Sequence, residues 1–62
     1  MLYVVGDSEN DHYRYRPYGL TIGSIVRCDH FDGGPTGAAI VTDEYGEMRY
    51  GRFVDGFWEP NK

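Results

Sequence analysis

Glycine and proline interrupt this 62-residue chain so often that a long helix has no room to form. Nine glycines and three prolines are scattered along the sequence. No window of ten or more residues keeps apolar side chains at the i, i+3, i+4, i+7 spacing of an amphipathic helix without meeting one of them. The apolar residues fall instead into short runs separated by polar turns. The chain is therefore predicted to be all-β.

The alternation of side chains places short strands between tight turns. Strands are predicted over six ranges: 2–5, 12–16, 20–29, 38–42, 48–54 and 57–59. Asp55-Gly56 is the strongest hairpin signal, because a type I′ turn needs positive φ at both central residues. Gly46 is the expected left-handed residue of the preceding turn, and Gly23-Ser24 indicates a bend or bulge.

The length of the chain limits it to one domain with a small core. A domain of this size buries only about 60% of the surface that its unfolded chain exposes. Residues 2–16 are expected to form an N-terminal hairpin, and residues 20–59 the core of a small barrel whose closure removes exposed edges. A dimer or higher oligomer is predicted because so small a core needs support. Four side chains of the segment 20–29 are predicted to point inward: Leu20, Ile22, Val26 and Cys28.

The cysteine and hydropathy patterns indicate an intracellular protein. Cys28 is the only cysteine, so neither an intrachain disulfide nor a four-cysteine zinc site is possible. A lone cysteine fits a reducing compartment. The apolar runs are far shorter than the roughly 20 residues of a membrane span, and Met1 to Val5 lacks the features of a signal peptide. We expect a soluble, cytoplasmic protein.

The rhythm of strands and turns over residues 20–59 resembles the SH3-like barrels of the Tudor and KOW kind. The resemblance lies in four stretches: 22–28, 39–41, Tyr45-Gly46 and 52–56. It implies a small SH3-like barrel of five or six short antiparallel strands that binds a partner without catalysis. In size and acidity the chain also resembles the accessory proteins that bacteriophages encode to bind host machinery. That likeness implies a protein that modulates a host protein in the host cytoplasm.

The net charge of −4, from ten acidic and six basic residues, favours a basic protein partner over a polyanion. Aromatic rings beside predicted turns are surrounded by carboxylates, an arrangement that suits a cationic ligand. The predicted partner-binding residues are Tyr18, Phe31, Tyr45, Trp58, Asp43, Glu44, Glu47 and Asp55. Because neighbouring strand residues face opposite sides, only one of Phe57 and Trp58 is expected in the core. The other is the candidate hot spot.

Single-stranded nucleic-acid binding is the alternative hypothesis, since arginines interleaved with aromatic rings can stack bases. Its candidate residues are Arg14, Arg16, Arg49 and Arg52. On a strand, however, Tyr13 and Tyr15 would turn to the core while Arg14 and Arg16 pair with acids of the segment 7–11. Mimicry of DNA, with carboxylates in place of phosphates, is a further variant of protein binding.

One acidic segment invites a catalytic interpretation. Residues 6–11, Gly-Asp-Ser-Glu-Asn-Asp, resemble the G-D-x-x-N-D loop of haloacid dehalogenase-type phosphatases, which implies Asp7 and Asp11 as magnesium ligands. That family also needs a nucleophilic aspartate on another parallel strand, a lysine and a much longer core. The only lysine of this chain is Lys62, so a solvated loop is the preferred interpretation.

A cysteine and two histidines form the other candidate for chemistry. Cys28 and His30 share a strand face, and His12 could join them. A structural zinc site needs four ligands, and a nucleophilic thiol needs a base and an oxyanion site. So short a scaffold cannot readily fix all of these groups. The sequence therefore predicts no enzymatic activity, no metal and no cofactor.

Overall fold

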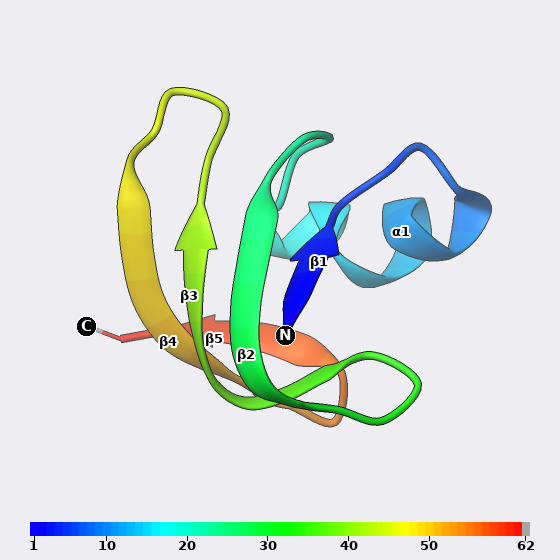
Figure 1. Cartoon of the computed structure of the whole chain (residues 1–62). Helices are drawn as coiled ribbons and strands as arrows, with labels where there is room; N and C mark the ends of the chain where they lie inside the picture. Colours follow the sequence, from blue (N-terminus) through cyan, green and yellow to red (C-terminus); the bar gives the residue numbers. More distant parts are fainter. Residues whose placement is uncertain (62) are drawn as a thin grey trace.

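A computed structural model describes residues 1–61 of the chain. Five strands form a single antiparallel sheet in which each strand pairs with the next, in the order β1-β2-β3-β4-β5 (Figure 1). The strands are β1 (Leu2–Val4), β2 (Ile25–Phe31), β3 (Pro35–Thr42), β4 (Met48–Val54) and β5 (Phe57–Pro60). The prediction of a small, mostly β fold built from short antiparallel strands is confirmed.

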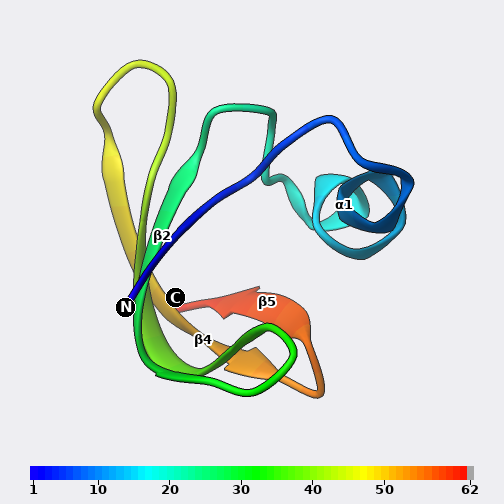
Figure 2. The same ribbon diagram turned by 45° about the vertical axis from the view of Figure 1, so that its right-hand side comes forward.

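The sheet is open, so the expected closure into a barrel is wrong. Among the described residues, β1 and β5 end the sheet and do not pair with each other. The sheet curves strongly, and helical segments lie beyond its concave side (Figure 2). The 3₁₀ helix η1 (Arg16–Tyr18) contacts β5. A helical segment thus occupies the space in which the two edge strands would have met.

The segment after β1 is helical, whereas a strand was predicted over residues 12–16. Helix α1 spans Glu9–Arg14. Ser8 is its N-cap, and the Ser8 Oγ accepts a hydrogen bond from the Asp11 backbone N–H at 3.1 Å. A serine followed three residues later by an acidic residue has the spacing of a capping box. At six residues, α1 is too short to show the longer apolar periodicity that indicates a helix.

The N-terminal hairpin expected over residues 2–16 is therefore absent. β1 pairs instead with β2, and Leu2 lies opposite Arg27 while Val4 lies opposite Ile25. The helical segment connects these two strands and returns the chain to the sheet.

The core lies between the concave face of the sheet and the helical segments. Its buried apolar residues are Val5, Tyr15, Leu20, Val26, Cys28, Ala39, Val41, Phe53 and Trp58. Of the four residues of the segment 20–29 that were predicted to point inward, Leu20, Val26 and Cys28 are buried. Ile22 is exposed, because the chain turns at Gly23, where φ is 90°, and β2 begins only at Ile25.

Aromatic rings link the helical segment to the sheet. The Tyr15 ring lies 5.4 Å from that of Tyr3 and 6.2 Å from that of Phe53, and Phe53 lies 5.1 Å from Trp58. Tyr13 was expected to share the core but is 80% exposed. Two residues subtend about 200° on a helix, so Tyr13 and Tyr15 point in opposite directions.

The turns between β3, β4 and β5 match their predicted chemistry. Asp55 and Gly56 have φ angles of 53° and 85°, as a type I′ turn requires, and Gly46 has a φ of 84°. Gly23-Ser24 forms the predicted bend, because the chain turns at Gly23, whereas the irregularity in the pairing of β2 with β3 lies between Cys28 and His30. Within residues 1–61, no helix has the length and apolar character needed to cross a membrane.

Candidate functional site

The predicted partner-binding residues do not form one surface. The turn 43–47 joins β3 to β4 at one end of the sheet, whereas the turn that holds Asp55 joins β4 to β5 at the other end (Figure 1). Phe31 packs on Tyr3, with ring centroids 5.8 Å apart, and Tyr18 packs on Phe57 at 5.0 Å. The eight residues are therefore divided between opposite ends of the molecule.

Trp58 is a core residue, so its assignment to the partner-binding surface is wrong. Its side chain is 4% exposed, while Phe57 is exposed. The expectation that only one of these two rings enters the core is confirmed by the alternation along β5. Trp58 takes the inward position because its ring packs on Phe53.

The turn 43–47 keeps one exposed aromatic ring among carboxylates. Tyr45 is 87% exposed, and Glu44 and Glu47 are also exposed. The Asp43 Oδ1 accepts hydrogen bonds from the backbone N–H groups of Tyr45 and Glu47, each at 2.9 Å. The carboxylate of Asp43 thus fixes the turn, while Tyr45, Glu44 and Glu47 remain open to solvent.

The four candidate arginines for nucleic-acid binding are also dispersed. Arg14 and Arg16 belong to the helical segment, and Arg49 and Arg52 alternate on β4 and so face opposite sides of the sheet. The Arg16 Nη2 donates to the Asp7 Oδ1 at 3.1 Å, as expected for this arginine. Arg14 was also expected to pair with an acid of the segment 7–11, but its Nη1 donates to the Gly33 carbonyl oxygen at 3.5 Å. These arginines do not make a continuous basic track.

The two aspartates of the phosphatase-like motif have structural partners. The buried Asp11 carboxylate accepts from the Tyr3 hydroxyl at 2.5 Å and from the Gly6 backbone N–H at 2.7 Å. Burial is the largest influence on the pKa of Asp11 and raises it, but these hydrogen bonds together hold that pKa below its ordinary value. Burial, followed by the hydrogen bond to the Asp11 carboxylate, raises the pKa of Tyr3. Asp11 therefore anchors β1 to α1.

Asp7 lies on the surface beside α1 and is engaged there. Its Oδ1 lies 2.9 Å from the His12 Nε2. The hydrogen bond with His12, followed by that from Arg16, lowers the pKa of the Asp7 carboxyl. Across residues 1–61, no three His, Cys, Asp or Glu side chains gather in an arrangement that could hold a metal ion. The acidic segment thus caps the N-terminus of α1 through Ser8 and binds His12 and Arg16 on the surface through Asp7.

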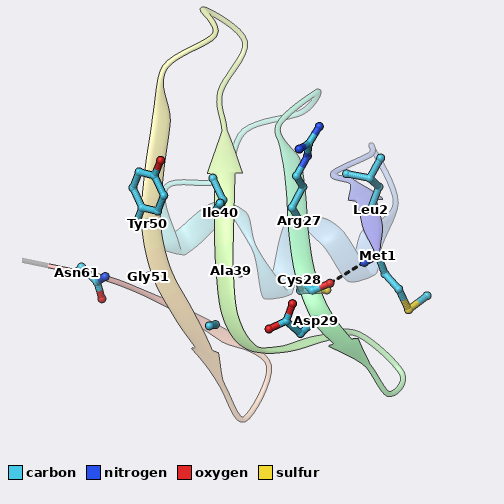
Figure 3. A pocket seen from close by; sticks show the side chains of 11 residues that line it. Met1, Leu2, Arg27, Cys28, Asp29, Ala39, Ile40, Tyr50, Gly51 and Asn61 are labelled. Carbon is cyan, nitrogen blue, oxygen red and sulfur yellow. Dashed lines mark hydrogen bonds between the residues drawn. The ribbon is translucent and has the colours of Figure 1, made fainter.

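The convex face of the sheet, opposite α1, carries apolar side chains in register. We call this surface the outer face. The pairing of β1 to β4 aligns Leu2, Arg27, Ile40 and Tyr50 in one row across the four strands (Figure 3). A second row consists of Val4, Ile25, Thr42 and Met48. Six of these eight positions hold an aliphatic, methionine or tyrosine side chain.

These side chains are open to solvent and border a hollow. Leu2 is 64% exposed and Tyr50 56% exposed, and Val4, Ile25 and Met48 are also exposed. A groove of about 510 Å³ runs across the strands between Met1 and Asn61, with Ala38 and Ile40 among its lining residues. In Figure 3 the labelled side chains of Leu2, Arg27, Ile40 and Tyr50 stand side by side along it. None of the described elements covers this face.

Charges of both signs border the apolar rows. Arg52 pairs with Ala38 on one side and with Glu59 on the other. Asp29 follows Cys28 on β2 and lines the same groove as Ala38. With Arg27, the outer face carries two basic and two acidic side chains and is balanced in charge, although the whole chain carries −4.

Comparisons with protein-family models, with curated proteins and with solved structures gave no match to this chain. The site is therefore assigned from its own geometry. The sequence did contain a signal for the outer face, because β2, β3 and β4 place apolar residues at outward positions as well as at inward ones. Strands that are apolar on both sides are typical of sheets covered on both faces.

Proposed function

We propose that this protein is a non-enzymatic protein-interaction module whose binding surface is the outer face of its sheet. The observation that carries the proposal is the pair of apolar rows held in register across β1 to β4 and left uncovered by the fold. Contiguous exposed apolar patches on small soluble domains mark interaction sites. A tyrosine flanked by aliphatic side chains and an arginine is typical of the centre of a protein interface.

The charge of the outer face favours a protein over a nucleic acid. Two arginines, Arg27 and Arg52, are offset by Asp29 and Glu59. A surface that binds single strands needs a positive groove that follows the phosphates. Binding of nucleic acid and mimicry of DNA both require a face dominated by one sign of charge. On the outer face neither sign dominates.

The turn 43–47 supplies a second contact for a basic partner. Tyr45 stands out from the sheet with Glu44 and Glu47 beside it, and Asp43 fixes the backbone beneath. Cationic side chains bind aromatic faces within a field of carboxylates. The same proposal includes a relationship to SH3-like barrels, an origin in a bacteriophage and a cytoplasmic location. The test of the proposal depends on none of these three.

Site-specific photo-crosslinking tests the proposal. A benzophenone amino acid replaces Tyr50 on the outer face or, as the matched control, Tyr13, which is exposed on the opposite side at α1. In cells that produce the protein, we expect covalent adducts to protein from position 50 and few from position 13. Equal yields from the two positions, or adducts to nucleic acid alone, would refute the outer face as a protein-binding surface.

A further inference from the structure

We infer that the partner of the outer face is a second copy of this chain, packed face to face about a two-fold axis that runs along β3. The inference rests on the proposed function, since it names the occupant of the same surface. It is carried by the distribution of residues over β2, β3 and β4, which makes the face complementary to itself. A two-fold interface requires that the residue which contacts another be contacted by it in turn.

Rotation about an axis parallel to β3, between the two faces, leaves each row at its own level. It places β3 on the partner's β3 and β2 on the partner's β4. Ile40 then meets the partner's Ile40 at the axis, and Ile25 meets the partner's Met48. These contacts follow from the pairings of β2 to β3 and of β3 to β4. Packed sheets keep their strands within about 30° of each other, so residues near the axis stay opposed.

The same rotation matches the polar residues. Arg27 lies over the partner's Tyr50, where the guanidinium and the ring form a cation–π contact. Asp29 lies over the partner's Arg52, and symmetry repeats this ion pair on the other side of the axis. Ala38 pairs with Arg52 and lines the same groove as Asp29, and its small side chain lets the two faces approach there. Every charged side chain of β2 and β4 on this face thus gains a partner of complementary chemistry.

Net charge confines such an association to the outer face. Each chain carries −4, so two copies repel each other wherever acidic surfaces meet, as at the turn 43–47. The outer face is the part of the described surface where apolar rows coincide with balanced charge. Two copies therefore associate most favourably through the outer face. The rotation along β3 also sets the two 43–47 turns side by side at one end of the dimer, so repulsion between their carboxylates weakens the association at low salt.

The area of the outer face sets the strength of the dimer. Because the outer face is convex, the contact centres on β2, β3 and β4, which this rotation opposes. Three strands spaced about 4.8 Å apart, with seven or eight residues rising about 3.3 Å each, present roughly 14 by 25 Å, or on the order of 350 Å² per chain. Standard interfaces bury about 800 Å² per partner. We therefore expect a weak, reversible dimer, as is typical of interfaces that bury less than about 1,200 Å² in total.

Sedimentation equilibrium with a charge exchange tests this inference. The wild-type protein is expected to shift from 7.1 kDa toward about twice that mass as its concentration rises through the micromolar range. The variant Asp29→Arg places an arginine opposite the partner's Arg52 in each contact. The variant Arg52→Asp places an aspartate opposite the partner's Asp29. Each variant alone is expected to dimerise at least tenfold more weakly, while an equimolar mixture of the two recovers the dimer, because both contacts then join opposite charges.

A matched variant separates this contact from a general effect of charge. Asp32→Arg changes the net charge as Asp29→Arg does, but Asp32 lies in the exposed loop between β2 and β3. We expect Asp32→Arg to dimerise at least as well as the wild type, since it lowers the overall repulsion. Trp58 fluorescence checks that each variant melts as the wild type does.

The failures of the two proposals are distinguishable. A wild-type mass of 7.1 kDa up to about millimolar concentration, or a mixture of the two variants that stays monomeric while the wild type dimerises, overturns this inference. If the wild type is monomeric but position 50 still crosslinks to another protein, the outer face remains a protein-binding surface and the second copy is excluded as its occupant. If position 50 gives no protein adduct either, both proposals fall.

Discussion

Gly51 is the position at which the smallest substitution, to alanine, should lower the stability of the fold most. It lies on β4 opposite Pro60 of β5, and it is buried. A Cβ added there would lie 2.8 Å from the Pro60 Cα and 2.8 Å from the Trp58 Cη2, and it would also overlap the Glu59 carbonyl oxygen. Contacts this short are not found in folded proteins. Gly51→Ala must therefore separate β5 from β4.

The cost follows from what would have to move. Over-packing of a core costs about 1–3 kcal/mol when side chains can adjust. At Gly51 two of the three obstacles are backbone atoms of β5, which cannot rotate away, and the third is the ring of Trp58. We therefore expect a loss near the upper end, about 3 kcal/mol. For a domain of about 60 residues this lowers the melting temperature by about 15 °C.

Thermal and urea unfolding followed by tryptophan fluorescence measure this loss, because Trp58 is the only tryptophan and lies in the core. Gly6→Ala is the matched control. A Cβ at Gly6 would meet only the Asp11 Oδ2, at an ordinary 3.5 Å, so its stability should stay within about 0.5 kcal/mol of the wild type. If Gly51→Ala melts within a few degrees of Gly6→Ala, the close approach of β4 and β5 described here is wrong.

Three further predictions concern the helical segment and the core. Folding lowers the pKa of the Asp11 carboxyl. The ionised carboxylate therefore stabilises the folded protein above its unfolded pKa of about 3.9, and this stabilisation is lost as the pH falls below about 4. Asp11→Asn should cost about 2 kcal/mol at pH 7 and flatten the acid limb of a urea-unfolding series, whereas an unchanged limb would contradict this origin. Ser8→Ala removes the N-cap and should cost about 1 kcal/mol in the same assay, and a neutral result would refute the cap. Cys28 is buried and should react with a thiol reagent only at the rate of unfolding, so rapid labelling of the native protein would contradict its placement.

Local turn chemistry was sufficient to predict much of the sheet. A type I′ turn at Asp55-Gly56 and a left-handed Gly46 are set by residues adjacent in sequence, and the structure shows both. The helix α1 was missed because its signal is a single cap, Ser8 followed by Asp11, and not a repeating pattern. The closed barrel was wrong because the position of the helical segment against the sheet, where η1 contacts β5, decides whether the edge strands can meet.

The candidate site depends on information that no local pattern holds. Tyr45 and Asp55 lie in separate turns of an alternating sequence, and only the strand directions place them at opposite ends of the sheet. Leu2, Arg27 and Tyr50 are separated by more than twenty residues from one to the next, and the register of three strand pairings brings them into one row. Gly51 was predictable in part, since a glycine inside a strand often marks a close backbone approach.

The connections between strands determine the order in which the molecule can open. β2 to β5 form a meander joined by turns of a few residues, whereas β1 reaches β2 only through residues 5–24, which hold α1 and η1. Closing the longer loop carries the larger entropic cost. The hydrogen bond from Tyr3 to Asp11 ties β1 to α1, so the two should detach as one cooperative unit. Their amide hydrogens should then exchange together and ahead of those in the meander. Because Leu2 and Val4 leave with β1, this opening would also remove one margin of the outer face and link local unfolding to the binding that we propose.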